Sequence, residues 1–225
     1  MNAIVFDWPP ATRVDRAISK TEVLARAGKP SGLRERLTRE LAEISWACKL
    51  ATTTLNLPPG GLPEFQVFRL RLKPGVATAS EPLLRAIDLA IPSPLLFEVT
   101  GDAGICTVGA PKRASAASPG KQVLGAYIAS PWVDAGTARH PLPVALDLAG
   151  LHQALLRALV PLAGRRGETL DALLERLAAV RLAERDGIRL QARLHAETQF
   201  NRKVQINQQL REAQRRLAQL REPGE

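Results

Sequence analysis

The chain has 225 residues, of which 45% are hydrophobic, and it carries a formal net charge of +9. This length and composition predict a globular protein of one or two domains with a sizeable core. No apolar run is long enough to span a bilayer, and the N-terminus lacks the basic and apolar regions of a signal peptide, so we expect a cytoplasmic protein without a membrane partner. The positive charge favours anionic partners, nucleic acid first.

Two helices are expected between residues 19 and 51, after a lead-in and before a loop at 52–63. Pro9 and Pro10 favour an extended backbone, and residues 1–18 are predicted to be a loosely ordered lead-in. The capping box from Ser19 to Glu22 predicts a short helix that ends at Gly28. A second helix is expected from Ser31 onward, because one helical stripe contains Leu33, Leu37, Leu41, Ile44, Cys48 and Ala51.

The middle of the chain has the pattern of a small sheet. Residues 65–73 alternate between apolar and basic side chains, which is typical of a half-buried strand. A helix is expected after Ser80, and further strands at 95–100, 105–109 and 122–128. The order β-α-β-β-β predicts an α+β fold with a mainly antiparallel four-stranded sheet, covered on one face by helices.

The domain organisation follows from these elements. Residues 1–163 are predicted to form an α+β globular domain with N-terminal helices at 19–51, a sheet at 64–132 and a helix at 147–160. Cys48 and Cys106 lie far apart in apolar elements, and we expect two buried thiols. Residues 164–225 are predicted to form a separate helical segment, in which Glu168 and Asp171 favour a helix N-terminus.

The C-terminal segment has a coiled-coil pattern. A regular apolar seam repeats with spacings of 4, 3, 4 and 3 over Ile206, Leu210, Ala213, Leu217 and Leu220. Asp186 and Gly187 leave a kink or a hairpin open. We expect one continuous helix, because a single glycine costs only about 1 kcal/mol.

One polar stretch, residues 197–207, interrupts this seam. Continued backwards, the pattern places Gln199 and Lys203 where apolar residues are expected. Two interpretations remain open: these side chains fix the register of a helix pair, or they form a recognition surface. In either case we expect Gln199 and Lys203 to be sheltered by a second copy or by the chain's own globular part. The candidate residues are Glu197, Gln199, Phe200, Asn201, Arg202, Lys203 and Asn207.

The sequence shows no pattern typical of an active site. His140, His152 and His195 lack metal-ligand spacing, and there is no phosphate-binding glycine loop and no nucleophile elbow. We therefore expect no metal and no cofactor. Asp88 and Glu98 are the acids that a degenerate nuclease would use, but no lysine follows Glu98 at the required spacing. The basic strand face formed by Arg69, Arg71 and Lys73 would hold phosphates or simply be solvated.

Several motifs resemble those of one protein family. The most specific is Glu-x-Gln-Phe-Asn-Arg-Lys-Val-x-x-Asn at 197–207. The others are Ile18-Ser-Lys20, Ile44-Ser-Trp46 with Lys49-Leu50, Ile87-Asp-x-x-Ile-Pro92 and Pro131-Trp132. In this order they resemble a bacterial family of unknown function, domain of unknown function 4391.

The resemblance implies an accessory protein found near DNA methyltransferases and helicases of restriction-type phage defence, with no established activity. We therefore expect a non-catalytic interaction subunit. Its partner would be a helicase or methyltransferase subunit, a second copy bound through the C-terminal helix, or both. The alternatives are sequence-tolerant nucleic-acid binding and, third, a degenerate metal-dependent nuclease.

Overall fold

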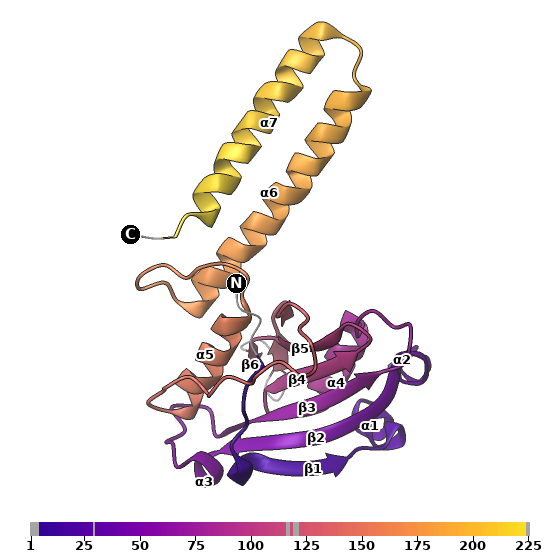
Figure 1. The fold of residues 1–225 in the computed structure, drawn as a ribbon, viewed down its shortest axis with the longest axis vertical. Coiled ribbons are helices and arrows are strands. Elements are labelled where there is room, and N and C mark those ends of the chain that lie inside the picture. Colours follow the sequence, from indigo (N-terminus) through magenta and orange to yellow (C-terminus); the bar gives the residue numbers. More distant parts are fainter. Residues whose placement is uncertain (1–4, 29, 116–117, 119–121, 224–225) are drawn as a thin grey trace. The chain divides into compact units, whose positions relative to one another are not determined.

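The structure, a computed structural model, describes residues 5–28, 30–115, 118 and 122–223 (Figure 1). The chain divides into two compact units, Met1–Leu159 and Val160–Glu225. No helix within the described ranges is long and apolar enough to cross a bilayer.

A mixed sheet forms the centre of the first unit and confirms the expected α+β class. Its six strands follow the order β1-β2-β3-β4-β5-β8, and only the β3–β4 pair is parallel. The strands are β1 (Arg13–Ala17), β2 (Leu41–Ala51), β3 (Glu64–Leu72), β4 (Leu95–Gly101), β5 (Gly104–Gly109) and β8 (Ile128–Ala129). The prediction of four strands was therefore too low.

The extra strands lie in segments for which the sequence predicted a different structure. The expected lead-in contains β1. The expected strand at 122–128 is divided, because β7 (Gln122–Leu124) pairs with β6 (Lys112–Ala114) in a separate ribbon while β8 joins the main sheet. The short helix α3 (Thr52–Leu55) follows β2.

The predicted second helix was wrong beyond Glu40. Helix α2 (Leu33–Glu40) ends there, and β2 begins at Leu41. The pairing of β2 with β3 is irregular between Leu41 and Glu43, and again between Trp46 and Cys48. Each irregularity adds a residue to β2, so Leu41 and Ile44 share a face although they are three apart. Because this spacing of three residues is close to the period of a helix, the sequence pattern predicted a helix here.

Three helices cover one face of the sheet, as Figure 1 shows. They are α1 (Lys20–Arg26), α2 and α4 (Glu81–Leu89). The backbone N–H of Glu22 donates to Ser19 Oγ at 3.1 Å, which confirms the expected start of α1. The apolar core between these helices and the sheet includes Leu37, Ile44, Leu70, Leu83, Ile87 and Phe97.

The other face is covered too, which corrects the expectation of one covered face. Helix α5 (Leu148–Leu159) packs there, with the His152 ring 5.1 Å from the Phe65 ring. It approaches so closely that a Cβ on Gly109 would lie 2.7 Å from Leu156 Cδ2. The N-terminal segment also covers this face and is not loosely ordered from residue 5 onward, because Val5, Phe6 and Trp8 are each at most 2% exposed. The 3-10 turn η1 (Pro10–Thr12) ends this segment.

Both cysteines are buried and free, as the sequence predicted. Cys48 lies in β2 and Cys106 in β5, within the core. Burial raises the pKa of the Cys106 thiol to about 12 and also raises the pKa of Cys48. Both thiols therefore remain protonated and unreactive near neutral pH.

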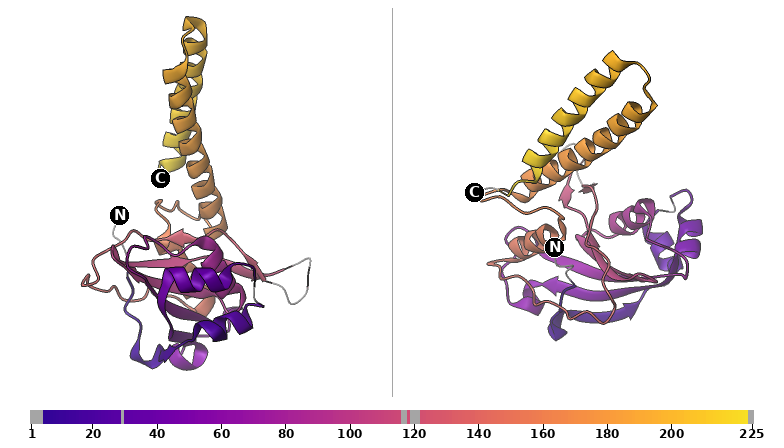
Figure 2. Two further views of the ribbon diagram at one scale, coloured as in Figure 1. Left: turned by 90° about the vertical axis from the view of Figure 1, so that its right-hand side faces the viewer. Right: turned by 45° about the horizontal axis from the view of Figure 1, so that its top comes forward.

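The second unit is a helical hairpin, so the expected single helix was wrong. Helix α6 (Leu170–Ala196) and helix α7 (Phe200–Arg221) lie side by side (Figures 1 and 2). The chain reverses at residues 197–199, while Gly187 lies inside α6. Leu190 packs with Ile206 and Leu210, so the apolar seam of α7 is covered by α6 of the same chain.

At the base of the hairpin, an arginine connects the segment before α6 with the last turn of α7. The Arg176 guanidinium donates to the Glu168 carboxylate at 2.7 and 2.8 Å, to Leu220 O at 2.9 Å and to Ala163 O at 2.6 Å. The hydrogen bonds from Arg176 lower the pKa of Glu168 to about 2. Glu168 is therefore more than a helix-start acid, because it holds the arginine that binds the last turn of α7.

Replacing Gly187 with alanine is expected to stabilise the hairpin. A Cβ at this position in α6 meets no atom within 4 Å, and alanine loses less backbone entropy than glycine in a helix. We expect Gly187→Ala to raise the free energy of unfolding by about 0.5–1 kcal/mol, measured by urea unfolding followed by circular dichroism at 222 nm. The control Gly167→Ala should lower it by about 1 kcal/mol, because Gly167 has φ +70°. Equal effects of the two substitutions would contradict this explanation.

Stability should depend on pH through His152. Burial lowers the pKa of this imidazole from 6.5 to about 4. The unfolded chain therefore binds the proton more tightly than the folded chain. The contribution of the neutral, buried imidazole to the free energy of unfolding is complete above about pH 6.5 and is lost as the pH falls toward 4. Its size is about 3 kcal/mol.

The measurement is the free energy of unfolding of wild type and His152→Leu at pH 7 and pH 4. The variant should lose about 3 kcal/mol less on acidification. Gln153→Leu, a neighbouring exposed position on α5, should follow the wild type. If His152→Leu loses as much stability as the wild type, another group is responsible.

Candidate functional site

The motif at 197–207 forms the tip of the hairpin. Its first residues close the turn: the Glu197 carboxylate accepts hydrogen bonds from the backbone N–H groups of Gln199 at 3.0 Å and Thr198 at 2.9 Å. These bonds lower the pKa of Glu197. Gln199 is the N-cap of α7, although its side chain makes no capping bond. Glu197 and Gln199 therefore form part of the turn that connects α6 with α7.

The other motif residues lie on the first two turns of α7 and face solvent. The Phe200 side chain is 77% exposed and Val204 is 43% exposed. The polar candidates Asn201, Arg202, Lys203 and Asn207 are exposed as well. These exposed candidates therefore lie together with Val204 on the first two turns of α7.

Gln199 and Lys203 are both exposed, so the two helices of the hairpin do not shelter them. The reason is the reversal at the tip. The backward extension of the seam assumed that residue 199 belongs to the same helix, but α7 begins at Phe200. The seam itself ends at Ile206, which packs against Leu190.

The basic strand face is largely neutralised within the chain. Arg69 Nε lies 3.0 Å from Glu98 Oε2, and Arg69 Nη1 lies 3.0 Å from Asp15 Oδ1. Arg71 Nη2 lies 2.7 Å from Glu43 Oε2, since Glu43 is opposite Arg71 in the register of β2 and β3. Lys73 follows β3 and is half-buried. Two of the three cations therefore already have carboxylate partners.

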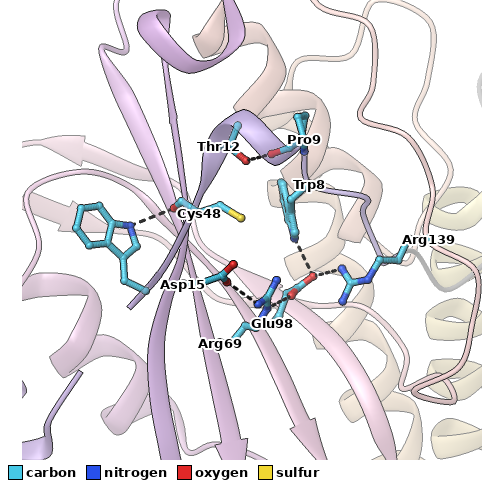
Figure 3. A network of polar contacts seen from close by, with 9 residues as sticks. Trp8, Pro9, Thr12, Asp15, Cys48, Arg69, Glu98 and Arg139 are labelled. Atoms are coloured by element: carbon cyan, nitrogen blue, oxygen red, sulfur yellow. Dashed lines mark hydrogen bonds and ion pairs between the residues drawn. The ribbon is translucent and has the colours of Figure 1, made fainter. Parts of the chain in front are cut away.

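Glu98 is the buried centre of a polar network, shown in Figure 3. Its side chain is fully buried; Trp8 Nε1 donates to Oε1 at 2.8 Å, and Arg139 Nη1 donates to the same oxygen at 2.5 Å. Arg139 also donates to Phe6 O at 2.6 Å. Two carboxylates, Glu98 and Asp15, thus meet two guanidinium groups. Sequence reasoning missed this network because its members are separated by up to 133 positions.

The second acid of the nuclease hypothesis has structural partners of its own. Asp88 in α4 pairs with Lys112 Nζ at 3.0 Å and accepts a hydrogen bond from Tyr127 Oη at 3.0 Å. Tyr127 contacts Phe97, which faces the α4 side of the sheet, whereas Glu98 next to Phe97 faces the opposite side. The two acids therefore do not converge. Among the described residues, no group of three His, Cys, Asp or Glu side chains could hold a metal ion.

Removing the charge of Glu98 should destabilise the first unit. Glu98→Gln leaves the guanidinium groups of Arg69 and Arg139 without their buried counter-charge, so we expect a loss of about 3 kcal/mol. Urea unfolding followed by tryptophan fluorescence measures it, since Trp8 is buried in this network. Glu43→Gln is the matched control. Its carboxylate also pairs with an arginine but is 52% exposed, and the loss there should stay below about 1 kcal/mol. Similar losses for both variants would refute the role given to Glu98.

Comparison with known proteins identifies a family. Neither the curated proteins nor the solved structures give a match. A family model described as "Domain of unknown function (DUF4391)" matches residues 6–217. The match begins at Phe6 in the buried N-terminal segment and extends into α7, so it spans residues of both compact units. The chain belongs to the family Domain of unknown function (DUF4391).

Proposed function

We propose that this protein is a non-catalytic accessory subunit that binds another protein through the tip of its helical hairpin. The observation that supports this most strongly is the exposure of Phe200. A phenylalanine that is 77% exposed contributes little to the stability of its own chain, and large exposed apolar side chains are typical of interaction sites. The hairpin has its own apolar seam, so folding does not require Phe200.

The neighbours of Phe200 define the chemistry of the partner surface. Val204 lies four residues further along α7, so the two apolar side chains project from the same side of the helix. Arg202 and Lys203 are exposed beside them. A complementary surface would offer an apolar pocket for Phe200 with acidic groups at its rim.

The proposed context comes from the family resemblance. The partner would be a DNA methyltransferase or helicase subunit of a restriction-type phage-defence system. A hairpin that presents a rigid helical tip suits this role, because little side-chain entropy is lost when an aromatic residue on a helix docks.

The competing functions have less support. For nucleic-acid binding, Arg69 and Arg71 are paired with carboxylates, which weakens the positive field on that strand face. For self-association, the seam of α7 is covered within one chain and has no need of a second copy. For a nuclease, Asp88 and Glu98 lie on opposite faces of the sheet.

The test is binding of the purified full chain to a methyltransferase subunit and to a helicase subunit of a restriction-type phage-defence system from the same organism. Affinities are measured by biolayer interferometry at two salt concentrations. Phe200→Ser/Val204→Ser should weaken binding by at least about tenfold, since an exposed aromatic anchor often dominates an interface. Higher salt should weaken wild-type binding moderately, because Arg202 and Lys203 would meet acidic groups.

Ile188→Ser is the matched control. Ile188 is another exposed apolar residue of the hairpin, at 67% exposure, but it lies in α6 outside the motif. This variant should bind like the wild type, and circular dichroism should show that all variants keep their helices. Absence of binding to either candidate, or equal binding by the double variant and the wild type, would overturn the proposal.

A further inference from the structure

A groove lies between α1 and α4, on the face of the sheet that α1, α2 and α4 cover. The proposed function does not use it. Its cavity volume is about 430 Å³. Trp46 and Phe68 form the floor, Ile18 lines it on the α1 side, and Ile87 and Ile91 line it on the α4 side. A concave, mostly apolar cavity of this size is typical of small-ligand sites.

The floor of the groove is held in place by the sheet. Trp46 stands opposite Arg16 of β1 and Phe68 of β3 in the strand register. The irregularity between Trp46 and Cys48 lets the indole Nε1 donate to Cys48 O at 3.2 Å. The indole thus keeps its aromatic face for packing, and its only polar atom has a partner within the chain.

The α4 wall is held by Lys112. Its buried ammonium group donates to the carbonyl oxygens of Asp88 at 2.6 Å and Ser93 at 3.2 Å, and also to Ile91 O. These carbonyls lie at and just beyond the C-terminal end of α4, where helix carbonyls lack partners inside the helix. The turn that carries Ile91 and Pro92 into the groove is therefore preformed.

The rim has a surplus of positive charge. Arg16 and Arg26 share one carboxylate, that of Glu22, at 3.1 and 3.2 Å. Deeper in the groove, the Glu64 carboxylate is neutralised by Lys49 at 2.7 Å. The Arg16 guanidinium also lies 5.6 Å from the centroid of the Trp46 ring. One unbalanced guanidinium charge thus adjoins an aromatic floor.

Five residues of the sequence motifs meet here: Ile18, Trp46, Ile87, Ile91 and Pro92. They come from three separate segments, and only the tertiary structure brings them together. From the apolar floor and the single unbalanced cation, we propose that this groove binds a small planar apolar ligand that carries one anionic group. The aromatic part packs on Trp46 between the α1 and α4 walls, and the anion is bound by Arg16 and Arg26.

The experiment uses two fluorescent probes with the full-length chain. 1-Anilinonaphthalene-8-sulfonate carries one sulfonate, and N-phenyl-1-naphthylamine is the same ring system without it. Titration should show that the wild type binds the sulfonate probe about tenfold more tightly than the neutral one. Arg26→Gln leaves Arg16 neutralised by Glu22, so it should remove this preference and leave the affinity for the neutral probe unchanged.

Variants of α4 locate the bound probe. Ala90 lines the groove, and Ala90→Phe should fill it and lower the affinity for both probes at least about tenfold. Leu89→Phe is the control, because Leu89 is 48% exposed and does not line the groove. It should bind both probes like the wild type. Thermal unfolding of each variant shows that a lost signal does not reflect a lost fold.

Four results would overturn the inference. They are no saturable binding by the wild type, equal binding by Ala90→Phe and Leu89→Phe, a sulfonate preference that survives in Arg26→Gln, and a signal abolished by Phe200→Ser/Val204→Ser. The last result would place the probe at the hairpin tip. No protein partner is present in this experiment, so failure of the proposed partner complex leaves its outcome unchanged.

Discussion

The first unit depends on the burial of one carboxylate. Glu98 is fully buried in β4, and a charge in that position is tolerated only where other groups compensate it. Three segments supply them: Trp8 from the N-terminal segment, Arg69 from β3 and Arg139 from the loop before α5. The need to satisfy Glu98 therefore keeps the N-terminal segment against the sheet, and that segment covers apolar strand residues which would otherwise meet water. The hydrogen bond from Trp8 to Glu98 thus acts with the buried side chains of Val5 and Phe6 to hold residues 5–9 in place.

Irregular pairing in β2 links this network to the opposite face. Between Trp46 and Cys48 the strand contains an additional residue, so Trp46 faces the α1 and α4 side while Cys48 faces the other. The same distortion places the indole beside Arg16 and Phe68. The irregular pairing between Trp46 and Cys48 thereby determines both which side chain enters the core on one face and which side chain lines the groove on the other. Lys112 has a comparable effect on α4, because its ammonium group binds carbonyl oxygens at and just beyond the C-terminal end of that helix.

The contacts that stabilise the hairpin lie at its base and in its middle, whereas the proposed recognition surface lies at its tip. At its base, the buried pair of Arg176 and Glu168 joins the beginning of α6 to the end of α7. In the middle, Leu190 and Ile206 supply apolar packing. At the tip, these contacts end and Phe200 faces solvent. Since the base and the middle hold the two helices together, the tip is free to vary its side chains without loss of the fold, which is the property expected of a binding surface.

The sequence by itself determined the features whose signals lie within about ten residues: the starts of α1 and α6, strands β3, β4 and β5, the apolar seam of α7, and the motif that marks the candidate site. The tertiary structure decided the rest. Strand β2 was hidden because its irregular pairing replaced a period of two with spacings of three, and because its second half is buried on both faces, at Ala47, Cys48, Leu50 and Ala51. The reversal at residues 197–199 carries no glycine or proline, and it is stabilised by the Glu197 carboxylate and by packing of α7 on α6. Exposure of Phe200 and convergence of Ile18, Trp46 and Ile91 in one groove followed from contacts between distant segments, and no local pattern encodes such contacts.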